Sequence, residues 1–219
     1  MHRWAICAVA ALVIVVGLGS HASAQNLLAN PSFEDPITFN GPPFVGFWEG
    51  FAGGGPNASA ANSSASPRTG TMNLDLTITN QDASFAGVFQ DVEGLTPGLL
   101  ATWSGFQRTP TSPTALGVAI EYRIEWRNSV TNTEVGRTPN SSTPIPTDVY
   151  APWSLTATIP AGADTARVVF AIQTFGGEPN PTNTGTVYVD DVSFTVVPEP
   201  SALALTGLGA LGMLRRRRA

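Results

Sequence analysis

The sequence contains one cysteine, two histidines and no lysine among its 219 residues. Cys7, His2 and His21 all lie near the N-terminus, so the rest of the chain has none of these three residue types. It cannot assemble a Ser-His-Asp or Cys-His nucleophilic site, a zinc site of imidazole or thiolate ligands, or an internal disulfide. The chemistry that remains is that of oxygen: carboxylates, amides, hydroxyls and hard cations such as calcium.

Basic residues are scarce between the two ends of the chain. The segment 25–197 contains six arginines and fifteen acidic residues, which gives it a net charge of −9. We do not expect nucleic acid as a partner, because affinity for it depends on neutralising phosphates with Lys and Arg. Long apolar runs are scarce as well, and the two that stand out, 4–18 and 202–214, flank this acidic segment.

The first apolar run predicts a secretory signal peptide over residues 1–24. Arg3 supplies the positive charge before the run, and Ala22-Ser23-Ala24 provides the small-residue cleavage pattern after it. The mature chain would then begin at Gln25. Cys7 lies inside the apolar run and does not match a lipoprotein cysteine. An uncleaved N-terminal anchor is the alternative.

The second apolar run is part of a three-part tail, residues 197–219. Pro198, Glu199 and Pro200 precede the run, and Arg215, Arg216, Arg217 and Arg218 follow it. Thirteen residues of helix span only about 20 Å, whereas a stable membrane span needs about 20 residues. The four arginines predict a membrane stop whose end stays on the cytoplasmic side. An ordinary C-terminal anchor is the alternative.

In order, spacing and terminal position this tail resembles the PEP-CTERM sorting signal of Gram-negative bacteria. The resemblance implies recognition and cleavage by an exosortase-type membrane protease. It also implies export through the inner membrane, with transient anchoring by the short helix, to the cell envelope or the extracellular space. Such bacteria typically make exopolysaccharide as well. The tail predicts where the protein goes, and not what it does there.

The segment between the two ends has a period of two in its apolar residues. The alternation is clearest over 74–78, 120–126 and 168–172, and no stretch has a convincing helical period. Further predicted strands cover 27–30, 85–92, 99–106, 154–159 and 186–196. Three stretches predict loops: 52–66, 138–147 and 178–185. Eight or more strands joined by Gly- and Pro-containing turns indicate an all-β domain over 25–196, an antiparallel β-sandwich or jelly roll.

Motifs at the two ends of this domain carry a second resemblance. Asn30-Pro31-Ser32-Phe33-Glu34 lies at its start and the segment 187–194, with Asp190-Asp191, at its end; segments 89–98 and 153–163 lie between. In this order they resemble the jelly-roll carbohydrate-binding modules related to the galactose-binding-like superfamily. The resemblance implies a polysaccharide partner and a structural calcium ion bound by Glu34 and one or both of Asp190 and Asp191. The alternative is that these acids are solvated and bind no ion.

The last strand carries its own irregularity. Val189 and Val192 are three residues apart, which breaks the alternation unless the strand bulges at Asp190-Asp191. Among the aromatic residues, Trp126 and Trp48 are expected in the core. Tyr150 and Trp153 adjoin a proline-rich stretch and are the candidates for an exposed, ligand-binding face.

Three functions remain open at this point. The first is non-catalytic binding of carbohydrate, such as exopolysaccharide. The second is a structural role in the envelope or biofilm matrix without specific sugar binding. The third is a glycan hydrolase that uses a pair of carboxylates. Glu121 and Glu125 share a strand face with Arg123 and Arg127, which favours a solvated charged surface, and no catalytic motif is present. The prediction is therefore a protein that is not an enzyme.

Overall fold

The computed structural model describes residues 24–110, 118–142, 147–175 and 183–197. The predicted signal peptide (apart from Ala24) and the predicted sorting tail from Pro198 to Arg218 lie outside the described residues. Within the described ranges no helix has the length and apolar character needed to cross a membrane.

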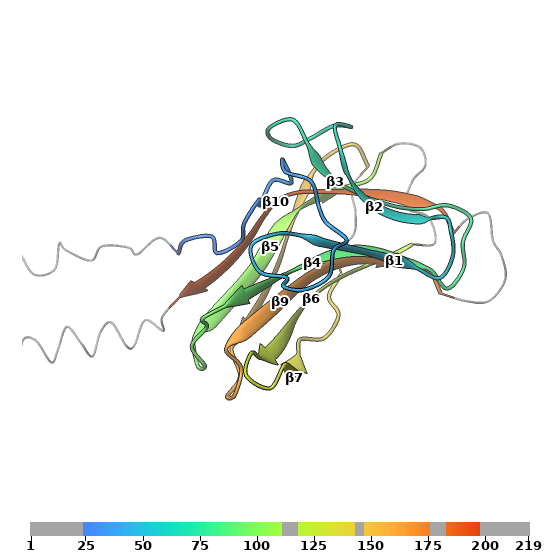
Figure 1. Ribbon diagram of the computed structural model, residues 1–219. Helices are drawn as coiled ribbons and strands as arrows, with labels where there is room; N and C mark the ends of the chain where they lie inside the picture. Colours follow the sequence, from blue (N-terminus) through green and yellow to red (C-terminus); the bar gives the residue numbers. More distant parts are fainter. Residues whose placement is uncertain (1–23, 111–117, 143–146, 176–182, 198–219) are drawn as a thin grey trace, which may run out of the picture.

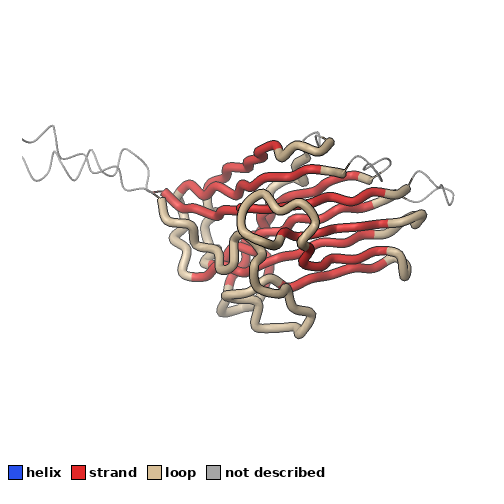
Figure 2. Tube along the Cα trace, turned by 90° about the horizontal axis from the view of Figure 1, so that it is seen from above, coloured by secondary structure: helices blue, strands red, loops and turns tan. Residues whose placement is uncertain are grey.

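Two antiparallel five-stranded sheets pack face to face (Figure 1). Sheet A has the order β1 (Glu49–Gly53), β4 (Phe85–Glu93), β9 (Thr165–Gln173), β6 (Ala119–Asn128), β7 (Thr133–Arg137). Sheet B has the order β2 (Ala58–Ser63), β3 (Asn73–Ile78), β10 (Gly185–Val197), β5 (Leu100–Arg108), β8 (Ala151–Thr158). The strands of both sheets run side by side along the length of the molecule (Figure 2). The chain crosses between the sheets at most of its connections, which confirms the predicted all-β sandwich.

The core lies between the sheets and follows the predicted alternation. Leu74, Leu76 and Ile78 of β3 are fully buried, because every second residue of a strand points to the same face. Trp126 is 4% exposed and Trp48 is 1% exposed, so both belong to the core as expected. Burial of this apolar surface is the main force that holds the two sheets together.

Two of the predicted elements, one strand and one loop, are wrong. Residues 27–30 form no strand, although Leu27 N donates to the carbonyl of Phe194 at 2.9 Å, so that this segment runs beside β10. Residues 52–66, predicted as a loop, contain β2. The small residues of β2 have no apolar alternation, but their backbone pairs with β3 from Ala58 to Ser63.

The predicted bulge in β10 is confirmed. Asp190 pairs with Phe106, but the next paired residue is Ser193, opposite Ser104. Asp191 adopts a left-handed conformation with φ of 48°, and its neighbour Val192 donates its N–H to the carbonyl of Pro31 at 2.9 Å. The N-terminal segment and the last strand are therefore joined at the bulge, and both ends of the described chain lie at the same end of the sandwich (Figure 1).

Candidate functional site

The bulge brings the predicted carboxylates Glu34, Asp190 and Asp191 against one loop, residues 66–72. Asp190 is fully buried. Its Oδ2 accepts from the backbone N–H groups of Arg68 at 2.7 Å and Thr69 at 3.2 Å, and its Oδ1 accepts from Asp191 N at 2.7 Å. Burial raises the pKa of Asp190 above the ordinary aspartate value, although these hydrogen bonds oppose the shift.

Asp191 completes the contact between the bulge and the loop. Its Oδ1 accepts from the hydroxyls of Ser32 at 2.8 Å and Thr69 at 2.6 Å, and its Oδ2 forms an ion pair with Arg68 Nη1. Burial acts to raise the pKa of Asp191, but the hydrogen bonds from Thr69, Ser32 and Arg68 outweigh it and the pKa is lowered. The Arg68 guanidinium also stacks over the Phe106 ring, 3.5 Å from its centroid.

Glu34 binds the other end of the same loop. Its Oε1 accepts from the N–H groups of Thr71 at 2.9 Å and Met72 at 3.1 Å, and its Oε2 accepts from the Thr71 hydroxyl at 2.7 Å. The bonds from the Thr71 hydroxyl and from Met72 N lower the pKa of Glu34. Gly70 has φ of 61°, and a Cβ at this position would collide with Glu34 Oε1, so a side chain here would push the Glu34 carboxylate away from the loop.

Calcium at this cluster stays a prediction, and the contacts do not favour it. Calcium takes six to eight oxygen ligands, but every carboxylate oxygen of Glu34, Asp190 and Asp191 already accepts from a donor of the protein. Across the described ranges, no three His, Cys, Asp or Glu side chains are grouped so that they could hold a metal ion. The residues therefore do not fit the ion that the resemblance implies.

The predicted ligand-binding pair, Tyr150 and Trp153, does not form an exposed face. Trp153 is 3% exposed and packs in the core against Tyr122, with ring centroids 4.6 Å apart, and against Trp103 at 4.8 Å. The expectation for Trp153 is wrong, because β8 directs this ring inward. Tyr150 is half-buried, and its hydroxyl donates to the Ser66 carbonyl at 3.2 Å. Burial raises its pKa.

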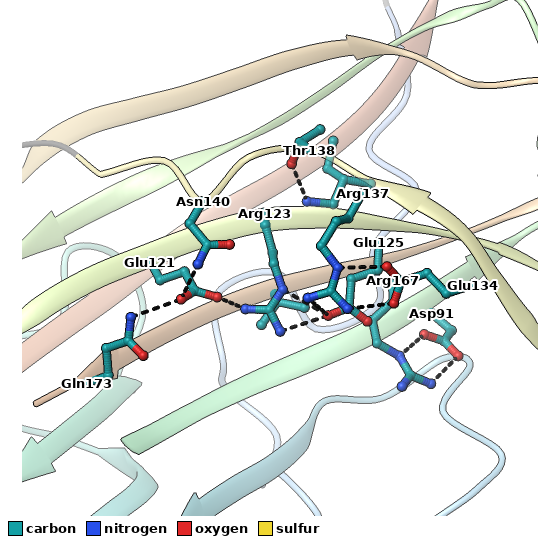
Figure 3. A network of polar contacts seen from close by, with 12 residues as sticks. Asp91, Glu121, Arg123, Glu125, Glu134, Arg137, Thr138, Asn140, Arg167 and Gln173 are labelled. Carbon is teal, nitrogen blue, oxygen red and sulfur yellow. Dashed lines mark hydrogen bonds and ion pairs between the residues drawn. The ribbon is translucent and has the colours of Figure 1, made fainter. Parts of the chain in front are cut away.

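The outer face of sheet A carries a network of polar side chains (Figure 3). Arg123 lies between two carboxylates of its own strand and forms ion pairs with both, with Nε 2.8 Å from Glu125 Oε1. The Oε2 of Glu121 accepts from Asn140 at 2.7 Å and from Gln173 at 3.1 Å. Side chains from β6, β9 and the segment after β7 thus meet in one layer.

This network corrects the expectation of a solvated charged surface. Glu121 and Glu125 are each 7% exposed, because Asn140, Gln173 and Arg123 cover them. Sequence alternation identified the face on which they lie but could not show what packs over it. Buried carboxylates are costly unless they are paired, so the pairing with Arg123 fixes the positions of both acids.

A row of phenylalanines continues the same face toward its β1 edge. Phe51, Phe85 and Phe89 contact one another through Phe51, whose ring centroid is 6.1 Å from each of the other two. Phe44, from the segment before β1, meets Phe89 edge-on at 4.8 Å. Phe85 is 43% exposed. Exposed rings of this kind offer flat apolar surface to a ligand.

Arg167 joins the aromatic row to the polar network. Its guanidinium forms a two-pronged ion pair with Asp91, at 2.7 and 2.9 Å, and lies over the rings of Phe89 at 4.2 Å and Phe44 at 4.8 Å. These aromatic residues were missed from the sequence. Phe85 and Phe89 are four residues apart on one strand, so they share a face, but residues on the other face of β4 are apolar too, and the outer face could not be told from the inner one.

Comparison with known protein families identifies the C-terminal end of the chain. Residues 196–218 match the model of the PEP-CTERM protein-sorting motif. The chain thus carries this sorting motif, which marks an exported protein processed at the cell envelope by an exosortase. A comparison with curated proteins finds no match.

Solved structures share the fold at low sequence identity. The xylan-binding domain CBM22-1 of a Paenibacillus barcinonensis xylanase is 14% identical, with a TM-score of 0.52, over 80% of this chain and 96% of that one. A Clostridium thermocellum xylanase fragment with CBM22-1 and GH10 modules, complexed with xylohexaose, is 16% identical at TM-score 0.53, over 79% of this chain and 29% of that one.

A phage enzyme has the same sandwich within a longer chain. The enzymatically active domain of tailspike protein 4 from bacteriophage CBA120 is 14% identical at TM-score 0.58, over 78% of this chain but only 21% of that one. At these identities the likeness establishes the fold alone. The fold is a β-sandwich of the kind found in carbohydrate-binding modules.

Proposed function

We propose that this protein is an exported, non-catalytic polysaccharide-binding protein that binds its polymer along the outer face of sheet A. The observation that carries the proposal is a row of aromatic rings, exposed at Phe85 and half-buried at Phe51, beside fixed polar groups on one face. Sugar rings have apolar faces that stack on aromatic side chains, and hydroxyl edges that need polar partners. Phe51 and Phe85 supply the first kind of surface, and Asn140 and Gln173 supply the second.

The sorting motif indicates where polysaccharide binding would take place. A protein processed at the envelope meets the cell's own exopolysaccharide or glycans of the environment. Single-site binding of a sugar polymer is weak, but many copies on one polymer raise the avidity. The alternative of a structural matrix protein without specific sugar binding predicts self-association and no retention by any polysaccharide.

The acids of this face do not support a hydrolase. A hydrolase needs one carboxyl that can give a proton and a second that attacks or activates water. Glu121 and Glu125 are both held by Arg123, and Asp91 is held by Arg167. Positions fixed by ion pairs suit a rigid binding surface better than proton transfer, which supports the non-catalytic proposal over the likeness to the phage enzyme.

Affinity electrophoresis tests the proposal. The full chain should be retarded by one class of polysaccharide in the gel, and Phe85→Ala and Phe51→Ala should each reduce the retardation. Tyr188→Ala is the matched control, since Tyr188 lies on the outer face of sheet B, between the buried Val187 and Val189. Equal loss in all three variants, or release of reducing sugar by the wild-type protein, would contradict the proposal.

A further inference from the structure

The loop 66–72 connects two segments that are far apart in sequence, the N-terminal segment at Ser32 and Glu34 and the bulge of β10 at Asp190 and Asp191. All of these contacts place a donor of the loop or of Ser32 against a carboxylate oxygen. The three carboxylates bring three negative charges to one loop, and Asp190 among them is fully buried. Such a group needs compensation by positive charge or by aligned N–H dipoles.

We infer that this contact of the loop with both ends of the domain, here called the clasp, works without a metal ion. The Arg68 guanidinium and the N–H groups of Arg68, Thr69, Thr71 and Met72 take the place that calcium is expected to occupy. Arg68 pairs with Asp191 through its side chain and binds Asp190 through its backbone. Arg68 thus neutralises the charge of Asp191 and donates a backbone hydrogen bond to the buried carboxylate of Asp190.

The remaining donors of the loop also take the place of a metal ion. Successive N–H groups of a loop with a left-handed residue form a concave site that binds an anion. Thr71 and Met72 donate to Glu34 in this way, beside Gly70 with its positive φ. The two hydroxyls on Asp191, from Ser32 and Thr69, are 2.8 and 2.6 Å away. An ion at this place would have to displace these donors.

The Arg68 side chain is itself held in place. Its guanidinium lies 3.5 Å from the centroid of Phe106, the residue paired with Asp190 across the β5–β10 ladder. A stacked and ion-paired guanidinium loses less freedom on binding than a free one, and lysine cannot reproduce this geometry. The clasp is independent of the proposed sugar-binding face, which lies on the other sheet.

Thermal unfolding of the full chain, purified in mild detergent, tests the inference. Its Tm should be the same in calcium, in chelator and in magnesium at equal ionic strength. Arg68→Gln should lower the Tm by about 4–8 °C, the shift that the loss of about 2 kcal/mol causes in a domain of this size. Arg127→Gln is the matched control, because the hydrogen bonds of the Arg127 guanidinium to Asn132 are long, at 3.4 Å, and its loss should leave the Tm within about 2 °C.

Two results would overturn the inference. One is a rise of the wild-type Tm in calcium that magnesium does not reproduce, which would mean that the ion binds despite the donors. The other is an equal Tm for the Arg68 and Arg127 variants. If Arg68→Gln fails to fold, the calcium and chelator measurements on the wild-type chain still decide the question. If calcium raised the Tm of the Arg68→Gln variant back to the wild-type value, the inference would be supported. This result would show that the arginine occupies the position of the ion.

Discussion

Gly87 of β4 lies directly beneath the ring of Phe51, and a Cβ at position 87 would be 2.5 Å from Phe51 Cζ and 2.8 Å from the Ala171 Cβ. The absence of a side chain at position 87 leaves room for the tip of the Phe51 ring. Val169 and Ala171 of the neighbouring strand β9 are 1% and 6% exposed. Their small side chains lie between the aromatic row and the polar network. The position of Phe51 thus depends on a residue that has no side chain.

Gly87→Ala should displace the Phe51 ring and destabilise the protein. Overpacking of this kind costs about 1–3 kcal/mol, and polysaccharide retention should fall with it. Urea unfolding together with affinity electrophoresis measures both effects. Gly136→Ala is the control, since a Cβ there meets nothing within 4 Å. Unchanged stability of Gly87→Ala would show that Phe51 moves aside at no cost.

Arg123→Met should be strongly destabilising, because it leaves Glu121 and Glu125 buried without their shared partner. Removal of one member of a buried ion pair costs about 3–5 kcal/mol. The triple variant with Glu121→Gln and Glu125→Gln should recover most of this loss, as measured by chemical unfolding. Arg137→Gln should change stability by about 1 kcal/mol or less, because Arg137 is 49% exposed. A similar loss in both arginine variants would argue against the central role of Arg123.

Trp153→Ala should cost about 3–5 kcal/mol of stability, because its ring is surrounded by Tyr122, Trp103 and Phe170. Trp153→Phe should recover part of the loss by refilling the space. Unfolding curves followed by circular dichroism would show this. A fully stable Trp153→Ala variant with impaired sugar binding would instead restore the original expectation of an exposed platform.

Asp75→Asn should stabilise the protein at neutral pH. Burial raises the pKa of Asp75 above its ordinary value, so the folded state holds the proton more tightly than the unfolded state does. The contribution of Asp75 to stability is therefore largest below the ordinary aspartate pKa and is lost as the pH rises through the raised value.

Asparagine at position 75 stays neutral and can still accept from the Thr77 hydroxyl, which is 2.8 Å from Asp75 Oδ1. The gain in the variant should accordingly vanish at acid pH. Unfolding measured across the acid to neutral range checks the sign, with Asp35→Asn as an exposed control. A gain that is the same at every pH would refute the titration as its cause.

The alternation of apolar and polar residues predicted the strands that have one buried face and one solvent-exposed face. Leu74 to Ile78 is the clearest case, and the break between Val189 and Val192 predicted the bulge correctly. Alternation carries no information where backbone pairing alone decides the structure. Residues 58–63 form an edge strand of small residues, and their membership of sheet B depends on β3, which no local pattern records.

The candidate binding face was harder to predict because it depends on what covers a strand. Glu121 and Glu125 have the spacing of an exposed face, but Asn140 from a distant segment packs over Glu121 and removes it from water. The carboxylates at the two ends were identified from the sequence, and they contact the same loop, residues 66–72. The loop that meets them was not, because Arg68 and Gly70 carry no signal that relates them to residues more than a hundred positions away.

The position of β10 also determines how the domain responds to a pull on its tail. This strand of 13 residues lies between β3 and β5 and ends at Val197, where the matched sorting motif (196–218) begins. A force applied at Val197 along the strand acts on both hydrogen-bonded ladders in shear, so many bonds must break together and not one after another. A domain tethered through this strand would resist drag from a bound polymer kinetically, through a slow rate of forced unfolding.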